Sequence, residues 1–225
     1  MTEELAPEPI AKARRELLKE PAPVHIWLWR TDIEAFPAQV LSASERAAAA
    51  RFRFPRDRAR ATSSRTGLRW LLGGYLGLPP ETLVFAVGAE GKPRLAGAGA
   101  VSFNLSHSGI YAAAVVSRDR EVGIDLERIR PDAVGRDIAA RFFSSQERSW
   151  LDATPGMEAF FRLWTAKEAV LKAMGTGLST PLNALSVRPG QDAPPWNLRE
   201  LDLAPGYATA VAFDGPPVEP EVMGV

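Results

Sequence analysis

Two spacings of apolar residues divide the chain into sheet-like and helix-like stretches. Runs in which every second position is apolar predict strands, and apolar residues three and four positions apart predict helices. The strands are expected at 25–30, 83–87, 101–105, 111–117, 122–127, 185–189, 198–203 and 207–213. Helices are expected within 44–76, interrupted before Pro55, and within 136–174, interrupted at 154–156.

The order of these elements is strand, helices and strands, followed by strands, helices and strands. This order predicts an α+β fold made of two similar halves, with no residue-level repeat between them. We expect the halves to cover 24–115 and 116–215. The proline-rich ends, 1–23 and 216–225, are expected to be a flexible extension and a flexible tail.

Composition and charge point to local sites rather than to a global surface property. The 225 residues are 46% apolar, which is enough for a sizeable core, and 27 basic residues balance 27 acidic ones. A neutral chain has no overall field for nucleic acid or an anionic membrane. The chain has no cysteine and shows neither a signal peptide nor an apolar run near the roughly 18 residues that span a bilayer. We therefore expect a cytoplasmic protein with no nucleic-acid or membrane partner.

The segment VGIDLE at 122–127 places two acids on one face of a predicted strand. Asp125 and Glu127 are separated by one residue, so their side chains project about 7 Å apart on the same side. An oxygen-only pair favours a hard cation such as Mg²⁺ over zinc, because only His25 and His107 could supply imidazole ligands. The alternative is the solvent face of an amphipathic strand.

A second acid lies among aromatic residues on the predicted helix 160–175. Glu168 follows Phe161 by seven residues and Trp164 by four, so it shares their face. A carboxylate buried beside aromatic rings needs a cation or hydrogen bonds, which makes Glu168 a candidate metal ligand or base. The alternative is an ordinary surface pair with Lys172, worth about 0.3 to 0.5 kcal/mol.

Two further clusters suit a polar or anionic ligand. Ser106-His107-Ser108-Gly109 follows a predicted strand as a turn, but it lacks the first glycine of a nucleophile elbow, which excludes a serine hydrolase. Eight arginines fall within 24 residues and could bind phosphate or form a solvated helix face: Arg46, Arg51, Arg53, Arg56, Arg58, Arg60, Arg65 and Arg69. The loop Gly91-Lys92-Pro93 adds a cation but is no Walker P-loop.

Five motifs, in this order and spacing, resemble those of the Sfp-type 4′-phosphopantetheinyl transferases. They are GKPRL (91–95), FNLSHSG (103–109), VGIDLERI (122–129), RFFSSQE (141–147) and WTAKEAVLKAMGTGL (164–178). The resemblance covers roughly residues 41 to 215. It implies two α+β halves related by a pseudo-twofold axis, with coenzyme A bound in the cleft between them.

The resemblance also implies roles for individual residues. It implies that Mg²⁺, with Mn²⁺ as an alternative ion, is held by Asp125, Glu127 and Glu168, and that Lys172 contacts the pyrophosphate. The residues implied at the adenine and 3′-phosphate end are Gly91, Lys92, Pro93, Ser106 and His107. The arginines favoured for phosphate contacts are Arg51, Arg58 and Arg65.

The implied reaction supplies its nucleophile from the substrate. A serine hydroxyl of an apo acyl or peptidyl carrier protein would attack coenzyme A and release adenosine 3′,5′-bisphosphate. Glu168, or a water held by the metal, would take the proton, and Lys172 would stabilise the leaving group. The implied enzyme is a monomer, and we expect the carrier to dock near residues 128–143.

Three alternatives share part of these features. Another magnesium-dependent transferase acting on a nucleotide pyrophosphate would use the same cation and arginines. A nucleic-acid-binding module could combine the arginine-rich helix with Phe52, Phe54 and Trp70 as stacking partners, although the zero net charge counts against it. An inactive relative could bind coenzyme A without transfer, although the acidic residues argue against that.

Overall fold

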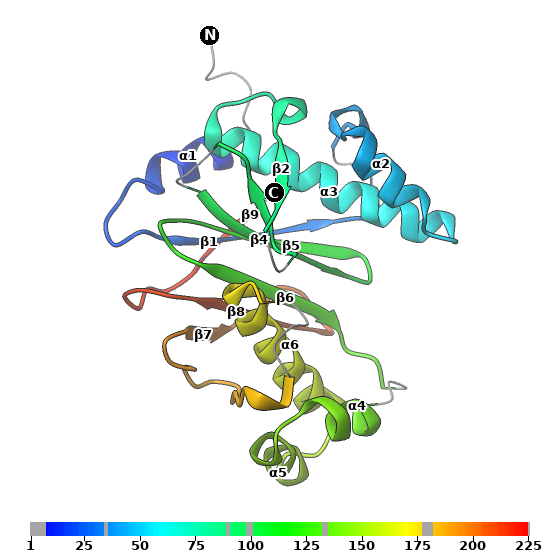
Figure 1. Cartoon of the computed structure of the whole chain (residues 1–225), viewed down its shortest axis with the longest axis vertical. Helices are drawn as coiled ribbons and strands as arrows, with labels where there is room; N and C mark the ends of the chain where they lie inside the picture. The colour runs from blue at the N-terminus through cyan, green and yellow to red at the C-terminus, as the bar shows by residue number, and fades with distance from the viewer. Residues whose placement is uncertain are drawn as a thin grey trace.

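Two β-sheets stacked face to face form the centre of the molecule, and helices cover their outer faces (Figure 1). The computed structural model describes residues 8–33, 36–88, 91–97, 101–131, 135–176 and 182–224. The helices are α1 (Glu8–Glu16), α2 (Ala43–Ala50), α3 (Pro55–Leu76), α4 (Gly135–Phe142), α5 (Ser145–Ala153) and α6 (Met157–Met174). The strands are β1 (Val24–Arg30), β2 (Phe85–Val87), β3 (Pro93–Leu95), β4 (Val101–Ser108), β5 (Tyr111–Arg118), β6 (Val122–Arg128), β7 (Asn197–Glu200), β8 (Tyr207–Phe213) and β9 (Glu221–Gly224).

The first sheet has the order β4-β5-β1-β9, and the second has the order β6-β8-β7. All neighbouring strands in them run antiparallel except β9, which runs parallel to β1. A separate hairpin of β2 and β3 lies at the edge of the first half. Helices α1, α2 and α3 lie above the first sheet in Figure 1, and α4, α5 and α6 lie below the second.

Alternation along each strand produces these layers. In β1, Trp27 and Trp29 pack towards α3, whereas Ile26 packs towards the second sheet. In β6, the apolar residues Ile124 and Leu126 enter the same inter-sheet core. Both sheets are thus covered on both faces, and the side of β6 that carries Gly123, Asp125 and Glu127 is directed towards α6.

Local sequence signals set the ends of the helices. Ser42 and Glu45 form a reciprocal capping box at the start of α2, and Ser144 and Glu147 form another at the start of α5. Helix α6 ends at Gly175, which adopts a left-handed conformation with φ 71°. The gaps between α2 and α3 and between α5 and α6 match the two breaks predicted from the sequence, whereas the gap between α4 and α5 was not predicted. The α+β fold with two halves is confirmed.

The two chain ends correct the expectation of flexible segments. Residues 8–16 form α1, whose Ile10, Ala13 and nearby Leu17 are buried in the core beside Trp27. At the other end, residues 221–224 form β9 and extend the first sheet. Helix α1 was missed because its apolar side chains, although at helical spacing, lie in a charged segment. Strand β9 was missed because it is short and is defined only by its pairing with β1. Residues 1–7 and 225 lie outside the described residues.

Three further differences concern the interior of the chain. The strand expected at 185–189 is absent from the described structure there, where a 3-10 helix at Leu182–Ala184 is followed by irregular chain. The short strand β3 had no signal because it contains a proline and only three residues. The expected boundary at 115/116 falls inside β5, which continues to Arg118. The residue at which the chain passes from one half to the other therefore stays a prediction.

Candidate active site at the junction of the two halves

Asp125 lies at the centre of the candidate site, on the side of β6 that faces α6. The residue is 4% exposed, and its Oδ1 accepts hydrogen bonds from Ser106 Oγ at 2.9 Å and from Lys172 Nζ at 2.6 Å. Its second oxygen, Oδ2, is buried without a hydrogen-bond partner. The structure therefore contradicts the alternative that Asp125 belongs to a solvent face, and it leaves a buried anionic oxygen without a partner.

Gly123 allows α6 to approach β6 closely enough to form this site. A Cβ built on Gly123 would lie 2.2 Å from the carbonyl oxygen of Ala169 and 2.3 Å from the amide nitrogen of Ala173. These contacts are shorter than any real Cβ tolerates, so only glycine fits here. The close approach brings Lys172 within 3.1 Å of the Ile124 carbonyl oxygen and beside Asp125. The alternative of an ordinary surface pair between Glu168 and Lys172 is therefore not supported, because Lys172 pairs with β6.

The serines of FNLSHSG lie on a strand, not in the turn expected from the sequence. Strand β4 continues to Ser108, so Ser106 and Ser108 share one side of it. Ser106 donates to Asp125, and Ser108 Oγ donates to Glu127 Oε2 at 2.7 Å. The serines therefore orient the acidic strand. Gly109, with φ 59°, makes the turn, and a Cβ there would lie 2.2 Å from the Tyr207 hydroxyl.

Three carboxylates surround the space between β6 and α6. Burial raises the pKa of the Glu168 carboxyl, and the negative charge of Asp125 raises it further. Burial also raises the pKa of Glu127, while its hydrogen bond from Ser108 opposes that rise. Both shifts show that negative charge is unfavourable here without a cation. The sequence expectation that Glu168 lies in a poorly solvated environment is confirmed.

The residues present fit a hard divalent cation. A cation would satisfy the buried Oδ2 of Asp125 and reverse the repulsion that raises the pKa values of Glu127 and Glu168. The donor set consists of carboxylate oxygens, which suits Mg²⁺. The oxygens of these three carboxylates do not all lie within the 4.8 Å that separates the ligand atoms of Glu16, His25 and Glu221.

His107 and Arg65 lie on the side of the site that faces α3. Desolvation by the surrounding protein lowers the pKa of the His107 imidazole, and the positive charges of Lys172 and Arg65 lower it further. The three groups are therefore electrostatic neighbours contributed by β4, α6 and α3. A neutral imidazole between two cations is suited to a ligand that carries negative charge.

Lys92 is directed into the protein rather than towards a ligand. Its ammonium donates to Glu121 Oε2 at 2.8 Å, to the Val122 carbonyl at 3.0 Å and to the Ala173 carbonyl at 3.1 Å. These contacts join a loop of the first half to β6 and to the last turn of α6. Gly91 and Pro93 flank Lys92 in the chain, and their place at the adenine end stays a prediction.

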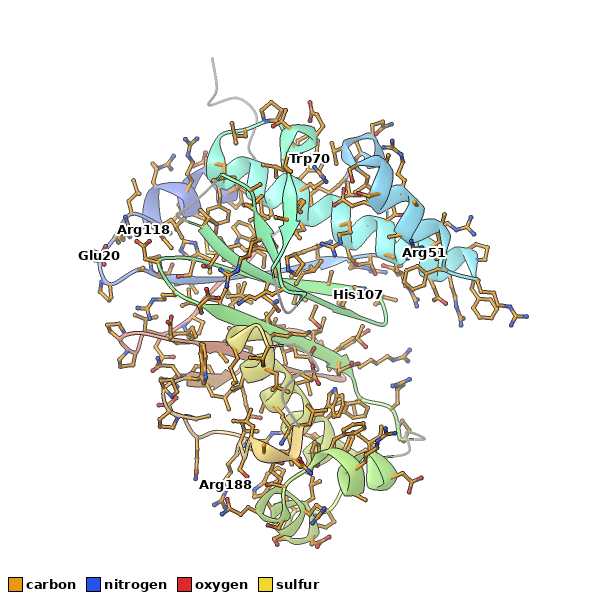
Figure 2. The ribbon with its side chains drawn as sticks, in the orientation of Figure 1. Glu20, Arg51, Trp70, His107, Arg118 and Arg188 are labelled. Carbon is orange, nitrogen blue, oxygen red and sulfur yellow. The ribbon has the colours of Figure 1, made fainter. Side chains whose placement is uncertain are left out.

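The arginines of α2 and α3 separate into two groups. Arg69 is buried and binds Glu45 Oε2 at 2.8 Å together with two carbonyl oxygens, so it holds α3 against α2 and the following loop. Arg51 ends α2, at the place that is labelled in Figure 2, and Arg58 is exposed on α3. Among the described residues, no hydrogen bond or ion pair joins either arginine to the acidic site, so a phosphate role for them stays a prediction.

A buried ion pair connects two of the sequence motifs and had not been recognised from the sequence. Lys167 on α6 donates to both carboxylate oxygens of Glu147, at 2.8 and 2.6 Å, and to the Leu185 carbonyl at 2.6 Å. The side chains are 0% and 1% exposed. The available signal was that Glu147 and Lys167 lie in two of the motifs quoted above, RFFSSQE and WTAKEAVLKAMGTGL, although neither residue had been given a role. Their role here is to anchor α5 to α6.

The fold and the site together define a two-halved α+β protein with an oxygen-ligand cation site at the junction of its halves. The model of the 4′-phosphopantetheinyl transferase superfamily matches residues 121–213, and the model of the 4′-phosphopantetheinyl transferase N-terminal region matches residues 28–119. The chain belongs to the 4′-phosphopantetheinyl transferase superfamily. It is thus an enzyme that transfers 4′-phosphopantetheine to carrier proteins, which confirms the resemblance seen in the motifs.

Individual relatives cover most of the chain. The 4′-phosphopantetheinyl transferase HetI of Nostoc is 39% identical over 211 residues, which are 84% of this chain and 88% of the relative. The 4′-phosphopantetheinyl transferase psf-1 of Bacillus pumilus is 35% identical over 78% of this chain and 80% of its own. The 4′-phosphopantetheinyl transferase Sfp of Bacillus subtilis is 30% identical over 78% of this chain and 83% of its own.

Among the described residues, no helix has both the length and the apolar character that a membrane span requires.

Proposed function

We propose that this enzyme takes its 4′-phosphopantetheine arm from coenzyme A and passes it to a serine hydroxyl of an apo acyl or peptidyl carrier protein, releasing adenosine 3′,5′-bisphosphate. The observation that carries the proposal is the buried, unpartnered Oδ2 of Asp125 among Glu127, Glu168 and Lys172. Three carboxylates and one ammonium leave an excess of two negative charges, which one divalent cation would balance.

Asp125, Glu127 and Glu168 are the residues that would hold Mg²⁺. When bound, the ion would neutralise negative charge on the pyrophosphate of coenzyme A. Lys172 is suited to contact the same pyrophosphate, because its side chain is 28% exposed while its ammonium already lies beside Asp125. A lysine that shares a carboxylate with the cation can turn to a phosphate oxygen without losing a charged partner.

The transfer step forms one P–O bond and breaks another. The serine oxygen of the carrier attacks the β-phosphorus of coenzyme A, and the bond from this phosphorus to the bridging oxygen breaks with its electron pair on adenosine 3′,5′-bisphosphate. Glu168 is the proposed base for the hydroxyl proton, because burial raises its pKa above the ordinary value and towards the range in which a carboxylate accepts protons well. Lys172 stabilises the departing phosphate.

The other end of coenzyme A is proposed to lie towards α3. Arg65 and His107 are electrostatic neighbours there, and they could receive the 3′-phosphate and the adenine. Arg51 at the end of α2 and Arg58 on α3 are both exposed. Gly91 and Pro93 flank Lys92 in a nearby loop. A phosphate contact from Lys92 would require its bonds to Glu121 and α6 to break, so the proposed site does not include it.

The test is the intact mass of an apo carrier protein after incubation with the enzyme, coenzyme A and Mg²⁺. We expect the carrier to gain one phosphopantetheine arm, and EDTA or Asp125→Asn to abolish the gain. Asp119→Asn is the matched control, because Asp119 is an exposed acid whose side chain is 65% accessible. Transfer that survives both EDTA and Asp125→Asn would overturn the proposed metal site.

Carrier docking is proposed at residues 128–143, which follow the acidic strand directly. Arg128, Arg130 and Arg141 are exposed there and could meet an acidic partner. Arg141→Glu tests this surface. It should raise the KM for the carrier and leave the KM for coenzyme A unchanged; equal carrier KM values would contradict this surface. A monomer in the cytoplasm completes the proposal.

A further inference from the structure

A second group of metal-type ligands lies away from the acidic strand, on the outer side of the first sheet. Glu16 at the end of α1, His25 on β1 and Glu221 on β9 each offer one ligand atom, and these atoms all lie within 4.8 Å of one another. The three residues come from three separate elements. Figure 1 shows α1 above the sheet in which β1 and β9 are neighbours.

His25 is fully buried, and only one of its ring nitrogens has a partner. Its Nδ1 lies 2.7 Å from the Tyr75 hydroxyl, which also accepts a hydrogen bond from Trp27 Nε1 at 2.9 Å. Its Nε2 is buried with no hydrogen-bond partner. Leaving such a nitrogen unpaired is unfavourable, so a buried imidazole in this state calls for an explanation.

Glu16 presents a second buried atom without a partner. Its Oε1 faces Lys19 at 3.5 Å and Lys12 at 4.0 Å, whereas its Oε2 is buried and accepts no hydrogen bond. Glu221 stands opposite His25 in the parallel register of β9 and β1, and its side chain is exposed. His25 and Glu16 thus each have a buried atom without a hydrogen-bond partner, and both belong to the group whose ligand atoms lie within 4.8 Å of one another.

The ligand chemistry selects the kind of ion. One imidazole and two carboxylates leave a fourth position for water, and this mixture suits Zn²⁺ and related transition-metal ions better than Mg²⁺, which prefers oxygen ligands alone. The Tyr75 hydroxyl would fix the ring and its tautomer, as partners beyond the ligands do in metal sites. Metal on Nε2 requires Nδ1 to carry the proton, and Nδ1 then donates to Tyr75.

We propose that Glu16, His25 and Glu221 form a structural binding site for a zinc-class divalent ion, which fastens α1 and β9 to β1. The site is separate from the acidic strand and does not depend on the transfer reaction. Its ligands join the two segments near the chain ends to the central strand of the first sheet, so a bound ion would stabilise contacts between regions far apart in sequence.

The test is direct metal binding by the metal-free, full-length protein, with excess MgCl₂ present to occupy the acidic strand. Zn²⁺ alone is titrated by calorimetry, and Co²⁺ alone by visible absorption. We expect one equivalent of tight Zn²⁺ binding, and at least a roughly 10-fold loss of affinity in Glu221→Gln, by analogy with changes around known sites. Glu219→Gln is the matched control, because Glu219 is an exposed acid of the same segment outside the cluster.

Glu221 is chosen because an exposed residue can be changed without endangering the fold. His25 is followed separately by NMR, since the chain has two histidines and His107→Gln leaves one imidazole to observe. Zn²⁺ should shift the Nε2 resonance of His25. The proposal is overturned if no Zn²⁺ binds under these conditions, if Glu221→Gln and Glu219→Gln bind it equally well, or if the His25 signal does not respond.

Discussion

Helix α6 carries two lysines five residues apart, Lys167 and Lys172. Each forms an ion pair with a carboxylate, but the surroundings of the two pairs differ. Lys167 and Glu147 are 0% and 1% exposed, and each charged atom of the pair has protein partners. Lys172 is 28% exposed, and its partner Asp125 keeps one oxygen without a partner. In the first pair, the two charges balance each other and hydrogen bonds satisfy the charged atoms. The second pair lies beside Glu127 and Glu168, so it has an excess of negative charge around it that a ligand must balance. A buried ion pair by itself therefore does not mark an active site; the unbalanced one does.

The largest effect is expected from Glu168→Gln, which removes the proposed base and a metal ligand from the unbalanced site. We expect kcat to fall by about 10²- to 10⁴-fold with little change in folding. In the unchanged enzyme, Glu168 is a base only when deprotonated, and its pKa is raised. Its kcat/KM should therefore fall as pH falls through the pKa of Glu168, and this fall should move to lower pH as the Mg²⁺ concentration rises, because the ion favours the charged carboxylate.

Glu158→Gln is the control, because Glu158 is an exposed acid in the first turn of the same helix. It should leave both the rate and the pH profile unchanged. A Glu168→Gln enzyme with normal kcat would show that another group takes the proton.

Breaking the balanced pair should affect stability rather than chemistry. Lys167→Met leaves the carboxylate of Glu147 buried without its cation, so the free energy of unfolding in urea should drop by about 3 to 5 kcal/mol. The double variant Lys167→Met with Glu147→Gln should recover part of this loss, because it removes the buried unpaired charge and the amide oxygen of glutamine can still accept one of the two backbone hydrogen bonds. Lys172→Met should show the opposite profile, with a smaller loss of stability and a larger loss of transfer. If Lys167→Met and Lys172→Met lost stability and transfer activity to the same extent, the distinction between the two ion pairs would be wrong.

Gly123→Ala tests whether close packing of α6 on β6 forms the unbalanced site. The added Cβ would meet backbone atoms at 2.2 and 2.3 Å, so the helix must shift, at a cost of about 1 to 3 kcal/mol in unfolding free energy. Transfer by the folded variant should also fall. Gly67→Ala is the comparison, since its Cβ would meet the Trp29 side chain instead. Gly67→Ala should lower the unfolding free energy without lowering the transfer rate. An unchanged transfer rate in Gly123→Ala would show that activity does not depend on the close packing of α6 on β6.

The smallest expected effect is the pH dependence of stability without metal. Glu127 and Glu168 have raised pKa values in the folded protein, so their contribution to stability is present at pH values below the usual glutamate pKa and is lost as pH rises through the raised values. Differential scanning calorimetry should show this loss in EDTA. Mg²⁺ should reduce it, because the ion favours the charged carboxylates. A loss that persists unchanged in Glu168→Gln would assign it to other groups.

Much of the fold could be predicted because periodicity depends on local sequence. The limits of β8 coincide with the predicted range 207–213, and the breaks between α2 and α3 and between α5 and α6 fall where proline and glycine occur. Strand β9 could not be predicted in this way, because pairing with β1 defines it. Helix α1 was missed because prolines and charges mask its few apolar residues, Ile10 and Ala13.

The candidate site was predicted in composition but not in geometry. Spacing marked Asp125, Glu127 and Glu168 as separate candidates, and the family resemblance implied that they act together. The structure places them on facing sides of β6 and α6. Nothing in the sequence showed that Lys92 turns inward or that Ser106 and Ser108 orient the acids from β4. Such details depend on contacts between segments far apart in the chain, which periodicity does not describe.

The parallel pairing of β9 with β1 has a consequence for how the protein is made. Strand β1 emerges early from the ribosome, and β5 can pair with one of its edges soon afterwards. Its other edge gains a neighbour only when residues 221–224 have been synthesised. Until then β1 presents an open edge with apolar side chains, the kind of surface that attracts other nascent chains. Completion of the first sheet thus waits until the second half has been translated.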